Sequence, residues 1–173
     1  GALTASTTAT DNTAVGHQAL NANTSGHSNT ALGTEAGHDL TTGARNTILG
    51  SKAGDAATTT DDTTLVGYGA GGGAIMTGHD NVAVGANALA ATTSGNSNVA
   101  IGKDAGTAIT TGDRNTAVGK DALKSMTTGS YSTAVGYQAL ENNTGNNNTA
   151  VGDQALEANT TGINNTAMGD DAL

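Results

Sequence analysis

The residue types that could carry out chemistry are few in this chain. The best candidates for metal binding or proton transfer are four histidines with irregular spacing, His17, His27, His38 and His79. Because they fall at different places in the repeat described below, they cannot stack into one metal-binding face. Adjacent carboxylates such as Asp61 and Asp62 point to opposite faces of an extended chain, and Gly71–Gly73 is more typical of a loop than of a phosphate-binding turn. The sequence therefore predicts no enzyme, no metal and no cofactor.

The elements that would position any site are units of a repeat. The stretch N-T-A-V-G-K-D-A-L at Asn115–Leu123 has near copies along the whole chain, spaced by seventeen residues except for one spacing of eighteen and one of sixteen. The copies begin at Asn12, Asn29, Asn46, Thr63, Asn81, Asn98, Asn115, Ser132, Asn148 and Asn165. The pattern predicts a single repeat array over residues 1–173. Both ends cut the repeat without a polar cap, which favours a segment of a longer fibre or an array that stacks end to end.

Composition and charge narrow the function classes. The 173 residues include 26 glycines and no Pro, Cys, Phe or Trp, so the chain lacks the large side chains of a conventional core. The formal net charge of −9 disfavours binding to nucleic acid or to an anionic membrane. No apolar run approaches the roughly 18 residues of a membrane span, so no membrane insertion is expected. These features predict an extracellular, cell-surface or virion-surface protein.

The strand signal lies in the first four positions of each coil, numbered from the Asn. Position 4 is aliphatic in all ten coils, and position 2 is Thr except at Val82 and Val99. Since alternate residues of a strand share a face, we expect positions 2 and 4 to point inward and the alanines at position 3 to point outward. Such a column of alanines is the expected surface for self-association, with five candidate interface residues: Ala83, Ala100, Ala117, Ala134 and Ala150.

The rest of the coil completes the predicted fold. Position 5 is always Gly, which permits a tight corner. Position 8 is always Ala and position 9 is Leu or Gly, which indicates a second short strand. A Thr-Thr-Gly or Thr-Ser-Gly turn then returns the chain. The prediction is an all-β protein, a parallel β-solenoid (β-roll) of about ten 17-residue coils with two short strands per coil and no helix.

The Asn at position 1 has two interpretations. It is a turn residue that tolerates the left-handed conformation, or it forms a ladder of amides that hydrogen-bond from coil to coil at the roughly 4.8 Å spacing of stacked strands. Thr63 and Ser132 at this position are compatible with both interpretations. The candidate ladder consists of Asn12, Asn29, Asn46, Asn81, Asn98, Asn115, Asn148 and Asn165.

Two coils carry a resemblance to a known family. The stretches D-N-V-A-V-G-A-N-A around Asn81 and S-N-V-A-I-G-K-D-A around Asn98 resemble the head repeats of trimeric autotransporter adhesins, whose motif is close to N-S-V-A-I-G-x-x-S/A. The variant at Asn148–Leu156 is similar to repeats of phage tail-fibre-like surface proteins. The resemblance implies a left-handed parallel β-roll with three chains side by side.

Three functions remain open at this stage. The first is a structural segment of a surface fibre or adhesin that assembles with itself, as a trimer or an end-to-end filament, and supports attachment to a host surface. The second is an ice-binding solenoid, although adjacent Thr-Thr pairs face opposite ways and lack a T-x-T alternation. The third is a glycan-binding surface, for which the chain offers only three aromatic side chains, Tyr68, Tyr131 and Tyr137.

Overall fold

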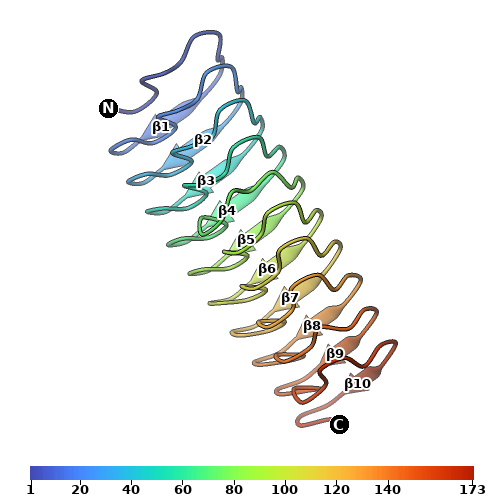
Figure 1. Ribbon diagram of the computed structural model, residues 1–173. Helices are drawn as coiled ribbons and strands as arrows, with labels where there is room; N and C mark the ends of the chain where they lie inside the picture. Colours follow the sequence, from blue (N-terminus) through green and yellow to red (C-terminus); the bar gives the residue numbers. More distant parts are fainter.

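The computed structural model describes residues 1–173 as one continuous stack of coils with a single short strand in each coil (Figure 1). The two termini lie at opposite ends of the stack. The strands are β1 (Thr13–Val15), β2 (Thr30–Leu32), β3 (Thr47–Leu49), β4 (Thr64–Val66), β5 (Val82–Val84), β6 (Val99–Ile101), β7 (Thr116–Val118), β8 (Thr133–Val135), β9 (Thr149–Val151) and β10 (Thr166–Met168).

All ten strands form one parallel sheet in the order of the sequence. The register aligns equivalent positions of successive coils, so that Ala117 in β7 pairs with Ala134 in β8. The long and short coils keep this register, since Thr64 pairs with Val82 and Thr133 pairs with Thr149. The predicted all-β parallel solenoid of 17-residue coils without a helix is thus confirmed.

The predicted second strand of each coil is wrong. Positions 6 to 11 form consecutive turns, in which the Ala of position 8 and the residue of position 9 point into the core. Position 9 has a left-handed backbone even where it is leucine, as at Leu123 with φ of 51°. A strand cannot continue through such a residue, so this side of the coil curves around the core.

The predicted orientation of the strands is also wrong. The position-3 side chains point into the core, and those of β2 to β9 are at most 1% exposed. The side chains of positions 2 and 4 face outward. The core lies between the position-3 column and the side chains of positions 8, 9 and 12. The alternation of side chains along a strand permits either orientation. The small alanines fit inside because the strand side and the turn side of each coil lie close together.

Position 9 is Leu in some coils and Gly in others because neighbouring core positions compensate in volume. Gly54 lies where an added Cβ would be 2.7 Å from Cδ1 of Leu65, a large residue at position 3. At Gly106 an added Cβ would lie 3.0 Å from Cδ1 of Ile109, a large residue at position 12. Most coils thus place one or two large apolar side chains in a narrow core that is otherwise filled by alanine.

Candidate interaction face

The asparagines of position 1 hydrogen-bond both along the stack and within their own coil. The backbone N–H of Asn115 donates to Oδ1 of Asn98 at 3.0 Å, and Nδ2 of Asn115 donates to the Gly129 carbonyl of the same coil at 2.9 Å. The second contact closes the coil across the return turn. The same closure is made by Nδ2 of Asn12, Asn29, Asn46, Asn81, Asn98 and Asn148.

The amide-to-amide contact of the ladder is present at some steps of the stack. Nδ2 of Asn46 donates to Oδ1 of Asn29 at 2.9 Å, and Nδ2 of Asn115 donates to Oδ1 of Asn98 at 3.1 Å. The ladder ends at Asn165 in the last coil, whose backbone N–H donates to Oδ1 of Asn148 at 2.9 Å. Most of these amides are buried. Each therefore supplies the hydrogen bond that a backbone group cannot obtain from water.

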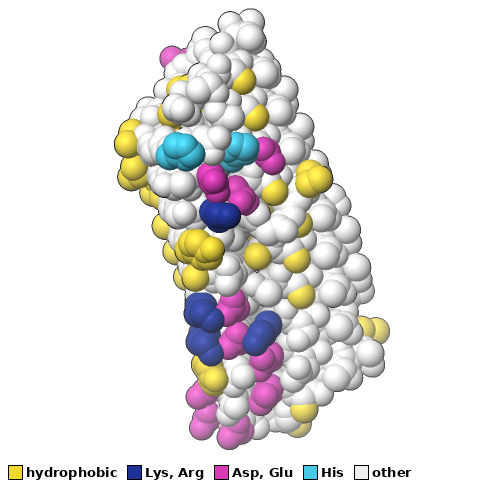
Figure 2. All heavy atoms as spheres, turned by 60° about the vertical axis from the view of Figure 1, so that its left-hand side comes forward, with side chains coloured by type: hydrophobic (Ala, Val, Ile, Leu, Met, Phe, Trp, Pro, Cys, Tyr) yellow, Lys and Arg dark blue, Asp and Glu magenta, His cyan; other side chains and the backbone are white.

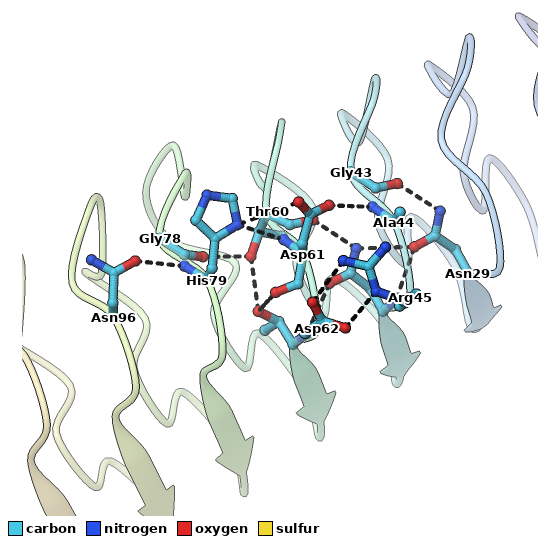
Figure 3. A network of polar contacts seen from close by, with 12 residues as sticks. Asn29, Gly43, Ala44, Arg45, Thr60, Asp61, Asp62, Gly78, His79 and Asn96 are labelled. Atoms are coloured by element: carbon cyan, nitrogen blue, oxygen red, sulfur yellow. Dashed lines mark hydrogen bonds and ion pairs between the residues drawn. The ribbon is translucent and has the colours of Figure 1, made fainter.

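Two further side-chain ladders flank the asparagines, and sequence reasoning missed both. At position 13 the Thr hydroxyl donates to the backbone carbonyl of the next coil, as from Thr93 to Thr110 at 3.1 Å. At position 16 a side-chain acceptor receives the backbone N–H of the preceding coil, as Asp113 does from Asn96 at 2.7 Å. Part of this second ladder is seen in Figure 3. These ladders explain how a turn without strand pairing is held in register.

The five predicted interface alanines cannot form an interface. Ala83, Ala100, Ala117, Ala134 and Ala150 are at most 1% exposed and belong to the continuous core. Their small size serves the close approach of the two walls within one chain, not the approach of a second chain. This prediction is therefore corrected: the alanine column is interior.

The outward side of the sheet is the surface that the strands leave unpartnered. We call the side chains of positions 2 and 4 the strand face. It has no charged residue in any coil, because position 2 is Thr or Val and position 4 is Val, Leu, Ile or Met. Several of its aliphatic side chains are strongly exposed, with Leu32 at 51%, Ile101 at 41% and Met168 at 73%. An uncharged sheet face with exposed aliphatic side chains of this kind is typical of an interaction surface.

Charged side chains gather elsewhere, in a band along the stack (Figure 2). Many occupy positions 6, 7 and 10, in pairs such as Lys120 with Asp121, whose Nζ and Oδ2 are 2.6 Å apart. Others occupy positions 11, 16 and 17, where Arg45 pairs with Asp62. Lys124 contacts the same carboxylate at 3.1 Å. Although burial raises the pKa of Asp121, the hydrogen bonds from both lysines hold that pKa below its ordinary value. The lysines of these pairs are exposed and the Asp121 carboxylate is buried. None of these charges lies on the strand face.

Two adjoining hollows lie beside the long coil. The larger has a volume of about 300 Å³ and the smaller about 170 Å³, and both are lined by Asp55 and Gly72. Several of the polar groups around them pair with one another, since Nζ of Lys52 lies 3.5 Å from Oε2 of Glu35 and Nδ1 of His38 lies 2.6 Å from Oδ1 of Asp39. Burial raises the pKa of Asp55. No group of three or more His, Asp or Glu side chains is arranged to hold a metal ion.

The three tyrosines do not converge on one site. Tyr131 accepts a hydrogen bond from Arg114 at 2.8 Å, and the ring of Tyr137 lies 5.0 Å from Nζ of Lys120. Tyr68 stands apart at the rim of the smaller hollow and is 60% exposed. Two of the three aromatic rings are therefore already engaged by cations of the same chain.

Buried amides at position 12 offer a test of the core. Asn23 is fully buried and neither of its side-chain polar atoms has a hydrogen-bond partner. The core accepts Met126 at the same position beside Leu123. We therefore expect Asn23→Met to raise the free energy of unfolding by about 1–3 kcal/mol, because it removes an unpaired buried amide. Urea denaturation followed by circular dichroism measures the change.

The matched control is Asn143→Met. Oδ1 of Asn143 accepts hydrogen bonds from Nδ2 of Asn148 and of Asn159, each at 3.0 Å, and its Nδ2 donates to the Gly145 carbonyl at 2.8 Å. Its replacement removes these three hydrogen bonds, so we expect a loss of similar size. A loss of stability at both sites would show that Asn23 is in fact hydrogen-bonded.

The chain forms no helix of the length and apolarity that crossing a membrane requires. Comparison with known proteins gave no further assignment: no protein-family model, no curated protein and no solved structure matches this chain.

Proposed function

We propose that this chain is a non-catalytic structural segment of an extracellular or virion surface fibre, which associates with further copies of itself through the strand face. The observation that carries the proposal is the uncharged column of exposed and half-buried aliphatic and Thr side chains along all ten strands. A rod-like stack of this kind holds parts at its two ends apart and needs no active site. The resemblance to trimeric adhesin heads supports an assembly of three chains.

A second copy of the chain is the partner whose repeat matches the strand face. Equivalent residues recur at the roughly 4.8 Å spacing of stacked strands, and another copy carries the same spacing. Packing that is favourable at one coil is therefore repeated at every coil. Because no charged residue occupies positions 2 and 4, two strand faces meet without burying a charge of either chain.

The size of the face bounds the strength of association. Ten strands of three residues cover roughly 500 Å² on each chain, below the roughly 800 Å² per partner of a standard interface. The edges of the face must contribute as well, and each added coil enlarges the contact. We therefore expect an assembly that dissociates on dilution.

Analytical ultracentrifugation over a concentration series tests the proposal. We expect wild type to associate at micromolar concentration and Ile101→Lys/Val135→Lys to remain monomeric, because a charge on each of two rungs cannot be buried unpaired. Both residues are exposed in the single chain, so the fold should tolerate lysine. The matched control is Thr111→Lys/Thr128→Lys, which places the same charges in exposed turns and should associate as wild type does.

Other outcomes would reassign the strand face. A monomeric wild type contradicts self-association, as does assembly of the strand-face variant at wild-type strength. A monomer that produces thermal hysteresis would instead identify an ice-binding surface built on the Thr side chains of position 2. Binding on a glycan array that is lost on Tyr68→Ala would place the function beside the hollows.

A further inference from the structure

The position-16 ladder contains one rung that differs chemically from the rest. In this ladder a side chain accepts the backbone N–H of the preceding coil (Figure 3). The acceptors are Asp61, His79, Asn96, Asp113, Ser130 and Asn146. Carboxylate, amide and hydroxyl oxygens all remain acceptors at neutral and mildly acidic pH. The imidazole of His79 is the exception.

His79 connects the 17-residue coil that ends at Asp62 to the 18-residue coil that follows. Its Nδ1 accepts the backbone N–H of Asp61 at 2.9 Å, and its own backbone N–H donates to Oδ1 of Asn96 at 2.9 Å. Acceptance at Nδ1 requires the neutral ring with its proton on Nε2. The ring is partly open to solvent, with 45% of the side chain exposed, so protons from water can reach it.

The charges around His79 are mainly negative. Oδ2 of Asp61 lies 3.7 Å from Nδ1, and Asp80 is the next residue in the chain. Asp62 interacts with His79 only through its charge and is engaged by Arg45, whose Nε and Nη2 donate to its two carboxylate oxygens at 2.6 and 2.7 Å. The residue of the following coil that contacts His79 is the neutral Asn96, which accepts the backbone N–H of His79. A protonated ring therefore finds an acceptor in the Asp61 carboxylate.

We propose that His79 is a pH-sensitive rung of the ladder. A proton on Nδ1 converts the acceptor of the Asp61 N–H into a donor, and the ring turns to donate to Oδ2 of Asp61. The backbone bond between the two coils is then replaced by a side-chain ion pair. Oδ1 of Asp61 stays bound to the Ala44 N–H at 2.7 Å, so the change is confined to one rung and the stack remains intact.

The experiment is amide hydrogen exchange by NMR on the whole chain, with rates normalised to those of unstructured peptides. Between about pH 8 and about pH 5, the range in which histidine titrates, we expect protection of the Asp61 amide to fall about fivefold, as the loss of one net hydrogen bond predicts. The N–H groups of Ala44 and His79 donate to Oδ1 of Asp61 and Oδ1 of Asn96, not to the ring, and should keep their protection. The ¹⁵N shifts of the ring should show the Nε2–H tautomer at the higher pH.

Two variants distinguish an effect of the His79 ring from an effect of pH on the rest of the protein. His79→Asn supplies the acceptor that Asn96 supplies one coil further, and it should make Asp61 protection independent of pH over this range. His27→Asn is the control, because His27 also occupies position 16 but its ring contacts only Ser28; it should behave as wild type. Constant Asp61 protection in wild type would overturn the proposal, as would a fall that persists in His79→Asn or an Nδ1–H tautomer at the higher pH.

Discussion

Replacing Ala117 with aspartate is expected to unfold the coils around β7, whereas the same replacement at the next residue, Val118, should leave the fold intact. Ala117 is 1% exposed and packs among apolar side chains, so a carboxylate there has no partner. Burying an unpaired charge costs several kcal/mol. Val118 is on the strand face, where a carboxylate remains in contact with water. We expect Val118→Asp to change the free energy of unfolding by about 1 kcal/mol or less.

Urea denaturation followed by circular dichroism measures the stability of both variants, because the circular dichroism signal reports the loss of sheet directly. Because each coil touches only its neighbours, unfolding of a repeat array need not be two-state. The comparison therefore uses midpoints together with amide exchange at β6 and β8. A larger loss for Val118→Asp than for Ala117→Asp would restore the opposite orientation of the strands.

The sequence predicted the repeat and its register but not which side of the strand is buried. The error arose because Val and Leu at position 4 are larger than Ala at position 3, and large apolar residues are usually inside. The signal that could have corrected it is the relation between the side-chain volumes at positions 3 and 9. The only two large residues at position 3, Ile48 and Leu65, occur in coils with Gly54 and Gly71 at position 9. Residues that compensate in volume share a core.

The position-16 ladder was invisible for a different reason. Its rungs include a carboxylate at Asp61, an imidazole at His79 and a hydroxyl at Ser130, which share only the ability to accept a hydrogen bond. A search for recurring residue types cannot find a column that is defined by one chemical property. The asparagine column was recognisable because a single residue type both closes the coil and continues the ladder.

The missing second strand shows the limit of hydrophobic pattern. Ala and Leu at positions 8 and 9 indicate burial, and both are buried. Burial does not determine backbone conformation, however, and Leu123 and Leu140 adopt φ values of 51° and 52° in the left-handed region. That conformation is unfavourable for leucine. It is held in place by backbone hydrogen bonds between coils, such as that from the Leu123 N–H to the Ala139 carbonyl at 3.1 Å.

The corner glycine at position 5 is expected to be the position least tolerant of substitution in the array. Gly119 has a φ of +136°, a conformation that residues with a side chain rarely adopt. An added Cβ would also lie 2.2 Å from the carbonyl oxygen of Gly136 and 2.6 Å from its carbonyl carbon, both of them backbone atoms of the next coil. The two coils would have to separate at this corner, which disrupts the hydrogen bond from the Gly136 N–H to the Val118 carbonyl.

Comparison with Gly169 separates backbone strain from the clash between coils. Gly169 has a similar φ of +129°, but the atom nearest to an added Cβ is Cβ of Ala172 at 3.9 Å. We expect Gly169→Ala to cost about 1–3 kcal/mol, the range for a residue in a disfavoured conformation, and Gly119→Ala to cost several kcal/mol more because the clash is added. Thermal and urea denaturation of the two variants measure the difference. Equal losses would show that backbone conformation alone selects glycine at the corner, and no loss in either would show that the corner has a different conformation.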